Sequence, residues 1–409
     1  MEKILNTMNF YEESLLLHKS HKGKLEIVSK VSVKTREELS IVYTPGIAKP
    51  CLLIARSPEE ARKHTIKANT IAVVSDGSAV FGLGNIGGMA SLPAMEGKAV
   101  LFKELGGVDA FPVCLSTQDT DGIVETVKNI ISSFGGISLE GIEAFRLINV
   151  ERRLKEELDI PVFHDGGHGV AVVVCAAVIN AFRFLKKPLK HVRALVCGAG
   201  VGGSHTAKML YAIGVRDIVI CDSKGILSAS RLSEFDEYKL ELLEFTNKDR
   251  LEGGLDDAIE GRDLFIGLSK PRLLTSEMVR TMEKDPVVFA LATPEPEIFP
   301  DLAKFGGARI AATCRPDFSN YIDTALAFPG VFRGALDAEA KEITEAMKLA
   351  AVHAIAEQVP DGELSEEYIL PDVFKQGLAS EVAKAVADAW VNDGMTREQL
   401  SVNDSYTFV

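Results

Sequence analysis

The sequence predicts an α/β fold in which short apolar strands alternate with helices. Two observations carry this prediction. Strand and helix patterns follow one another along most of the chain, and a glycine-rich segment separates a strand from a helix near residue 200. We expect an N-terminal α/β domain, residues 1–160, and a doubly wound parallel-sheet (Rossmann-type) domain with C-terminal helices, residues 161–409. No repeat of fixed period is present, which argues against solenoids and propellers.

Composition and charge exclude several classes of protein. The chain of 409 residues has 45 basic and 58 acidic residues and a formal charge of −13, so nucleic acids and anionic membranes are poor partners. Its longest apolar run, residues 170–179, is about half as long as a membrane span requires. The N-terminus lacks a secretory pattern, and the 6 cysteines form no C-x-x-C pair. We therefore expect a cytoplasmic protein in a reducing compartment.

Local signals define the elements of the N-terminal half. Thr35 starts a capping-box pattern, and its helix must end before Pro45, which leaves Tyr43 on a loop. Residues 71–81 are predicted as a hairpin, because Asp76-Gly77 suits the positive φ angles of a tight turn. The further predictions are a helix at 93–105 that carries Lys98, a strand at 108–115, a helix at 122–134, a helix at 144–158 and a strand at 160–164.

The C-terminal half has the more regular pattern. Near-continuously apolar strands separated by helical crossovers are typical of a parallel sheet that is covered on both faces. The predicted strands are residues 193–197, 217–221, 263–268, 286–292 and 308–312. From Ala335 the pattern is helical, and we expect this tail to pack against one of the two domains.

Two segments match the pattern G-x-G-x-x-G, and their surroundings distinguish them. Gly82, Gly84 and Gly87 follow the expected hairpin, and no acidic residue ends a second strand after them, so a tight structural loop is the favoured interpretation.

The second match has the surroundings of a dinucleotide site. Gly198, Gly200 and Gly203 follow a strand directly and open a helix, and Asp222 ends the next strand 19 residues after Gly203. Backbone N–H groups at such a helix start hold a pyrophosphate, and the carboxylate holds the ribose hydroxyls. Asp222 favours NAD over NADP, although Lys224 nearby can soften that preference.

Several chemically capable residues are uninformative when each is taken alone. His164 and His168 have the i, i+4 spacing of zinc ligands on a helix, but the two glycines between them argue against a helix. Glu140 and Lys98 are expected as ordinary solvated residues, and Tyr43 as a turn aromatic.

Read together, these segments resemble the malic enzymes of the small bacterial and archaeal type, NAD(P)-dependent oxidoreductases that decarboxylate malate. The segments that carry the resemblance are YTPGIAKPC from Tyr43, SDGSAVFGLGNIGG from Ser75, AMEGKAVLFKELGGVDAFPVCL from Ala94, TQDT from Thr117, PVFHDGGHG from Pro161, CGAGVGG from Cys197 and AFPGVFRGALD from Ala327. They span nearly the whole chain in order. The resemblance implies a small dicarboxylic acid substrate and a homodimer.

The resemblance also implies roles for single residues. By motif position, Lys98 is the base that takes the proton of the malate 2-hydroxyl group, and Tyr43 is the acid that protonates the enolate to pyruvate. For Lys98 to act near neutral pH, its pKa must fall well below the usual value of about 10.4. The resemblance further implies Mg²⁺ or Mn²⁺ as a Lewis acid.

The metal site departs from the family pattern. Gly141 and Gly166 stand where the family usually has aspartate ligands, so Glu140 alone matches a ligand position, with Asp165 as the retained neighbour. We expect these two carboxylates to bind Mg²⁺ or Mn²⁺ more weakly than a full ligand set.

The substrate pocket departs as well. Thr293 and Thr324 replace two asparagines that usually contact malate, and the Asp323 carboxylate is expected to repel a dicarboxylate unless a cation screens it.

Three hypotheses follow. The leading one is a malic enzyme with impaired activity. The second is a catalytically inactive NAD-binding protein on the same scaffold. The third is a dehydrogenase of a different 2-hydroxy or 2-amino acid.

Overall fold

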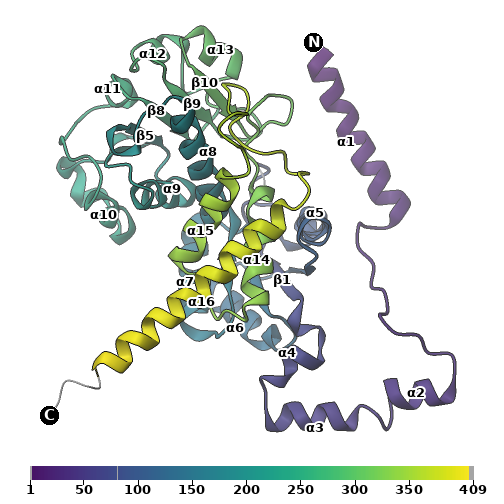
Figure 1. Ribbon diagram of the computed structural model, residues 1–409. Helices are drawn as coiled ribbons and strands as arrows, with labels where there is room; N and C mark the ends of the chain where they lie inside the picture. Colours follow the sequence, from purple (N-terminus) through teal and green to yellow (C-terminus); the bar gives the residue numbers. More distant parts are fainter. Residues whose placement is uncertain (1, 81, 405–409) are drawn as a thin grey trace.

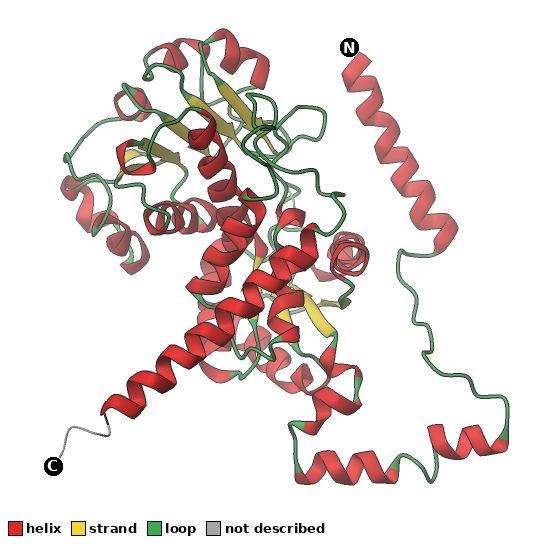
Figure 2. Cartoon of the chain, viewed as in Figure 1, coloured by secondary structure: helices red, strands yellow, loops and turns green. Residues whose placement is uncertain are grey.

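The computed structural model describes residues 2–80 and 82–404 and confirms the α/β class. Two separate sheets form the body of the protein, with helices packed around each (Figure 2). An N-terminal arm extends from the body, and a long C-terminal helix crosses the body (Figure 1).

The arm contains three helices and carries few contacts to the body. They are α1 (Glu2–His21), α2 (Arg36–Val42) and α3 (Ala48–Arg56). The predicted capping box is confirmed: Thr35 Oγ1 accepts a hydrogen bond from the Glu38 N–H, and the Glu38 carboxylate accepts one from the Thr35 N–H. Neither α2 nor α3 has a buried residue, so packing within this chain does not explain their apolar side chains.

The arm leads through α4 (Glu60–His64) into the first sheet. Its strands are β1 (Thr70–Ser75), β2 (Asp109–Cys114), β3 (Gly136–Leu139) and β4 (Val162–His164). Its helices are α5 (Gly88–Gly106), α6 (Thr120–Ile130) and α7 (Ala144–Glu157). The strand order is β2-β1-β3-β4 and all pairs are parallel, so the carboxyl ends of the four strands share one edge.

The hairpin predicted at residues 71–81 is wrong. Among the described residues 71–80 only β1 forms, and the chain then enters a loop in which Asp76 accepts hydrogen bonds from the N–H and hydroxyl groups of Ser78. The Gly77 carbonyl accepts N–H groups from Ile86 and Gly87. The Asp-Gly pair therefore closes a compact loop instead of pairing two strands.

The second sheet has six strands. They are β5 (Arg193–Cys197), β6 (Asp217–Asp222), β7 (Gly225–Ile226), β8 (Leu264–Gly267), β9 (Val287–Ala290) and β10 (Ile310–Thr313). Their order is β10-β9-β8-β5-β6-β7, and all pairs except β6 with β7 are parallel. The five strands predicted in this half are confirmed, and the two-residue edge strand β7 is an addition.

Short helices cross over between these strands, as a doubly wound sheet requires. They are α9 (Val201–Ala212), α10 (Glu237–Leu243), α11 (Leu255–Ile259), α12 (Ser276–Arg280) and α13 (Pro300–Phe305).

A buried helix, α8 (Val170–Phe184), connects the two sheets in sequence. Residues 165–184 are long and apolar enough to cross a membrane, but 78% of the apolar window is buried inside the protein. This burial is typical of a core helix.

The C-terminal helices pack against both halves of the body. They are α14 (Phe328–Asp337), α15 (Glu345–Ala356) and α16 (Leu378–Asp404). Helix α14 contacts α5 of the first half, α15 contacts α8, and α16 lies across α14 and α15 (Figure 1). Gly330 and Gly334 permit the close approach of α16, because a Cβ atom at either would lie within 2.6 Å of it. The expectation that the tail packs on one domain is therefore wrong.

Candidate active site

Three predicted site residues meet at the carboxyl edge of the first sheet. Glu140 follows β3, Asp165 follows β4, and Lys98 reaches them from α5. The Lys98 Nζ lies 3.0 Å from Glu140 Oε1 and 2.5 Å from Asp165 Oδ2. All three side chains are buried, and the ammonium also lies 3.6 Å from the centre of the Phe328 ring. The expectation that Glu140 and Lys98 are solvated is wrong once the fold brings them together.

The carboxylates keep Lys98 protonated. Burial lowers the pKa of Lys98, but the charges of Asp165 and Glu140 and their hydrogen bonds outweigh it and raise the pKa above its usual value. Burial also raises the pKa of Glu140, and the Lys98 charge opposes that rise. A base requires a low Lys98 pKa, and this arrangement of charges does not provide one.

One carboxylate oxygen of this cluster lacks a hydrogen-bond partner. Asp165 Oδ1 is buried and accepts no hydrogen bond from the residues that the structure describes, whereas Glu140 Oε1 lies 3.0 Å from the Lys98 ammonium. Thr324 donates its hydroxyl hydrogen bond to the other Asp165 oxygen, Oδ2. Carboxylate oxygens are the ligands that Mg²⁺ and Mn²⁺ prefer, and the buried Asp165 Oδ1 has no other partner, so Glu140 and Asp165 fit a divalent cation with two protein ligands.

The two glycines beside these carboxylates differ in their surroundings. A Cβ atom at Gly166 would meet nothing within 4 Å, so this position has room for a side chain. Gly141 has φ +61°, and its Cβ would lie 3.0 Å from Ser75 Oγ and 3.2 Å from Val80. A side chain is therefore tolerated at Gly166 and strained at Gly141.

Tyr43 is not brought to Lys98 within this chain. It lies directly after α2 in the N-terminal arm, and 63% of its surface is exposed. Figure 1 shows α2 and α3 apart from both sheets.

The predicted dinucleotide loop lies between a strand and the start of a helix, as the prediction requires. Gly198, Gly200 and Gly203 connect β5 to the start of α9. Gly198 has φ +122°, and a Cβ there would lie 2.4 Å from the Leu268 carbonyl oxygen. A Cβ at Gly203 would lie 1.8 Å from the Gly198 carbonyl oxygen, whereas Gly200 faces open space. The helix start is thus left free for a ligand phosphate.

Asp222 ends β6 as predicted, but two cations hold its carboxylate. Arg231 and Lys239 each donate a hydrogen bond of 3.0 Å to it, and the Lys224 N–H donates one of 2.9 Å. Burial raises the pKa of Asp222, but these hydrogen bonds outweigh that effect and lower the pKa to about 2. No local sequence signal links Arg231 and Lys239 to Asp222, since they lie 9 and 17 residues away from it.

A cleft of about 360 Å³ lies between the glycine loop and the Asp165 loop. Its lining includes Gly166, Gly202, Leu268, Thr293 and Thr324. The Thr293 and Thr324 positions predicted for substrate contact thus share one cleft with the nucleotide loop.

Asp323 does not have the free carboxylate that the sequence suggested. Its Oδ2 accepts the hydroxyl hydrogen bond of Tyr321, and its Oδ1 accepts one of 2.8 Å from the Ala325 N–H. The expected repulsion of a dicarboxylate is therefore reduced, because the charge is used to cap a turn.

The first glycine pattern forms the tight loop that was expected. Gly82, Gly84 and Gly87 all have φ between +73° and +79°, and Gly87 directly precedes α5.

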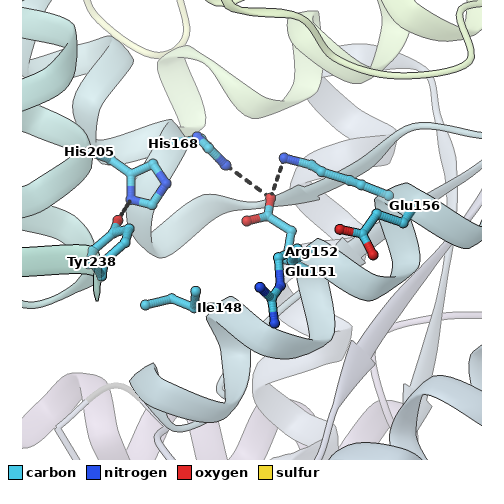
Figure 3. A pocket seen from close by; sticks show the side chains of 8 residues that line it. Ile148, Glu151, Arg152, Glu156, His168, His205 and Tyr238 are labelled. Atoms are coloured by element: carbon cyan, nitrogen blue, oxygen red, sulfur yellow. Dashed lines mark hydrogen bonds and ion pairs between the residues drawn. The ribbon is translucent and has the colours of Figure 1, made fainter. Parts of the chain in front are cut away.

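A cluster that sequence reasoning missed lies beside the active-site strands. Glu151, on α7, accepts a hydrogen bond of 2.9 Å from His168 Nε2 (Figure 3). It also lies 3.1 Å from His164 Nε2. His205 of α9 packs against both histidine rings, at 5.0 and 4.2 Å between ring centres. Glu151 and His205 gave no signal in the sequence, because their partners are distant along the chain.

Comparisons with known proteins agree with this geometry. The family model described as "Malic enzyme, N-terminal domain" matches residues 22–155, and "Malic enzyme, NAD binding domain" matches residues 168–304 and 311–391. The bifunctional malic/malolactic enzyme of Bacillus subtilis is 49% identical over 390 residues, which are 95% of each chain. The NAD-dependent malic enzyme of Geobacillus stearothermophilus is 49% identical over 98% of this chain and 83% of its own.

Solved structures are similar along nearly the whole chain. The NAD-dependent malic enzyme of Thermotoga maritima has a TM-score of 0.88 and 44% identity, covering 91% of this chain and 98% of its own. The malic enzyme of Entamoeba histolytica has a TM-score of 0.91 and 33% identity, covering 95% of this chain and 83% of its own.

Proposed function

Because this chain belongs to the malic enzyme family, we propose that it oxidatively decarboxylates (S)-malate to pyruvate and CO₂ with reduction of NAD or NADP. The observation that carries the proposal is the buried group of Lys98, Glu140 and Asp165, placed beside a cleft that the nucleotide loop also borders. The family match along most of the chain does not favour the alternatives of an inactive NAD-binding protein or a dehydrogenase of a different acid.

We propose that Lys98 is the base that accepts the proton of the malate 2-hydroxyl group. Lys98 must lose its own proton first, and Asp165 Oδ2, 2.5 Å away, is an acceptor in position. Any interaction that withdraws negative charge from Glu140 and Asp165 lowers the Lys98 pKa toward the range in which a base works. Phe328 covers the ammonium on another side and excludes water from it.

Glu140 and Asp165 are the residues that hold Mg²⁺ or Mn²⁺ in this proposal. When bound, the ion supplies a Lewis acid that stabilises negative charge on the substrate oxygens. With glycine at positions 141 and 166, two protein carboxylates remain, so we expect weak binding that depends on water and substrate oxygens.

Gly198, Gly200, Gly203 and Asp222 form the proposed cofactor site. We propose a preference for NAD, because the Asp222 carboxylate occupies the region where a 2′-phosphate would lie. Arg231 and Lys239 weaken this preference, since they neutralise much of its charge.

A homodimer explains the N-terminal arm and the place of Tyr43. The arm exposes large apolar side chains, among them Ile27, Val28, Leu39 and Ile41, which are 51–89% exposed. Exposed apolar surface of this extent marks an interface. We propose that the arm packs on a second copy of the chain and that Tyr43 acts there as the acid that protonates the enolate.

The remaining assignments are also proposals. We place the protein in the cytoplasm, with no nucleic-acid or membrane partner, in line with its charge of −13. The two sheets support a division into residues 1–160 and 161–409, although β4, which follows that boundary, pairs with β3 in the first sheet.

The substrate assignment is tested by following NADH formation with malate and with a panel of other 2-hydroxy and 2-amino acids at millimolar Mn²⁺. We expect malate to give the largest kcat/KM. A larger kcat/KM for another acid would show that this acid, and not malate, is the preferred substrate.

A further inference from the structure

Glu151, His168 and His205, with His164 behind them, form a second group of side chains that can bind a metal ion. One ligand atom from each of the four lies within 4.8 Å of the others. The spacing of His164 and His168 is the zinc pattern that intervening glycines argued against. The structure removes that objection, because residues 165–169 form a π-helical turn that brings the two rings to 4.4 Å between centres.

The group joins three elements of the fold. Glu151 lies on α7 beside the first sheet, His168 lies in the turn between β4 and α8, and His205 lies on α9, the helix that follows the nucleotide loop. Glu151 is 7% exposed and His168 4% exposed. A buried carboxylate and buried imidazoles in one place are the ligand types that zinc binds.

The hydrogen bonds of His205 leave the correct ring nitrogen free. Its Nδ1 lies 2.8 Å from the Val201 carbonyl oxygen, which can only accept, so the ring proton is on Nδ1. Nε2 then carries a lone pair. A backbone carbonyl that fixes the tautomer in this way is typical of metal-ligating histidines. Burial also lowers the pKa of His205 to about 3, which keeps the ring neutral near pH 7.

His164 has a different role, because the Gly167 N–H donates a hydrogen bond of 3.1 Å to its Nδ1. The ring proton of His164 is therefore on Nε2, which faces Glu151 Oε2 at 3.1 Å. His164 thus positions the carboxylate, and Glu151 Oε1 is the oxygen left for an ion.

Two lysines face the group and must be accommodated. Lys155 contacts Glu151 Oε1 at 2.8 Å, but its side chain is 32% exposed and can turn to solvent when an ion takes its place. Lys348 Nζ lies 3.1 Å from His168 Nδ1 and 2.5 Å from Glu345 Oε1. When an ion takes His168 Nε2, the proton that this nitrogen donates to Glu151 moves to Nδ1, and Lys348 turns toward Glu345.

We propose that Glu151, His168 and His205 bind a divalent transition-metal ion of the zinc class. A cavity of about 330 Å³, lined by Ile148, Arg152 and Tyr238 among others, adjoins the three ligands (Figure 3). This cavity supplies water for the fourth position. Two imidazoles and one carboxylate favour Zn²⁺ or Co²⁺ over Mg²⁺, so the site is chemically distinct from the Glu140 and Asp165 pair.

An ion at this site connects α7 to α9. These helices belong to different halves of the protein, so the ion holds the nucleotide helix against the layer that carries the catalytic strands. We expect bound Zn²⁺ to raise the melting temperature of the chain.

The test is calorimetric titration of Zn²⁺ into the metal-free full-length chain, without malate or NAD, in a Cys51→Ser background that removes the exposed thiol. The compared variants are His205→Gln, the matched control His191→Gln at an exposed histidine, and Glu140→Gln at the other metal site. The parent chain is expected to bind one Zn²⁺, and His205→Gln is expected to bind it at least about 10-fold more weakly. His191→Gln and Glu140→Gln should bind as the parent does.

A second readout separates ligand loss from misfolding. Zn²⁺ should raise the melting temperature of the parent and of His191→Gln but not of a His205→Gln chain that melts cooperatively without metal. Unchanged Zn²⁺ binding in His205→Gln, loss of binding in Glu140→Gln, or no binding by the parent would each overturn the proposal. None of these results depends on malate turnover, so the proposed function is tested separately.

Discussion

At the scale of single residues, the site is governed by the balance of charge around Lys98. One ammonium lies between two buried carboxylates, and each of the three depends on the others to offset the cost of burial. The same contacts that make the group stable also hold Lys98 protonated. The proposed role of Lys98 as a base therefore requires a change in the charge of its carboxylate partners.

Replacing Lys98 tests its assignment as the base. We expect Lys98→Gln to lower kcat for malate oxidation by at least about 100-fold, because the substitution removes the amine proposed to accept the hydroxyl proton. Lys103→Gln is the matched control, since Lys103 lies on the same helix with an exposed side chain. A Lys98→Gln enzyme with near-normal kcat would remove Lys98 from the mechanism.

The two glycines at the proposed metal site should respond differently when each is replaced by aspartate. Gly166→Asp is expected to strengthen Mn²⁺ binding by about tenfold, or ~1.4 kcal/mol, because it adds a carboxylate where there is open space. Gly141→Asp is expected to lower the free energy of unfolding by about 1 kcal/mol or more, because of its positive φ angle.

Calorimetry with Mn²⁺ and chemical denaturation measure the two effects. Gly166→Asn is the control that keeps the size of the side chain without its charge. Stronger Mn²⁺ binding in Gly141→Asp than in Gly166→Asp would contradict this account of the site.

Asp222 is expected to control the choice of cofactor. Asp222→Ser should raise the ratio of kcat/KM for NADP to that for NAD by about tenfold or more, equivalent to ~1.4 kcal/mol. The substitution removes a carboxylate that repels a 2′-phosphate and frees Arg231 and Lys239 to bind one. Steady-state kinetics with both cofactors measure the ratio.

The double variant Asp222→Ser, Arg231→Ala provides the control. It should lose most of the gain with NADP if Arg231 binds the phosphate. An unchanged ratio in Asp222→Ser would place cofactor selection elsewhere.

At the scale of elements, the N-terminal arm is the part of the fold that a single chain explains least. Its helices expose several large apolar side chains and bury none on α2 or α3, and the loop with Tyr43 follows α2. Packing against a second copy would bury these side chains and place the arm beside another protomer.

A charge placed on the arm should dissociate the proposed dimer. Ile41 is 68% exposed, and we expect Ile41→Glu to shift the protein from a mass near twice 44.2 kDa toward 44.2 kDa in sedimentation experiments. Phe305→Glu is the matched control on α13, where the side chain is 72% exposed. A parent chain that sediments as a monomer would contradict the proposed role of the arm.

At the same scale, the success of sequence reasoning depended on how local the signal was. The strands of the second sheet, the glycine loop and the Thr35 capping box depend on near neighbours, and all were predictable. The hairpin at 71–81 failed because Asp76 bonds to Ser78, so the Asp-Gly pair closes a loop without a second strand.

At the scale of the whole molecule, the residues of the site could be predicted from the sequence, but the contacts that set their pKa values could not. The motifs indicated Lys98, Glu140 and Asp165 separately, and only the order of the parallel strands brings them into contact. The bond from Thr324 to Asp165 joins residues 159 positions apart, and the cluster around Glu151 likewise depends on distant contacts. The direction of the Lys98 pKa followed from these contacts, so no motif could provide it.

The central claim is that this scaffold, with two carboxylates at its metal site, still performs oxidative decarboxylation. The most direct measurement is the ratio of pyruvate to NADH formed from (S)-malate at saturating Mn²⁺, with the products quantified by NMR and absorbance in the parent and in Lys98→Gln. We expect one pyruvate for each NADH in the parent and neither product above background in Lys98→Gln. NADH formed with oxaloacetate in place of pyruvate, or no product in the parent, would contradict the account.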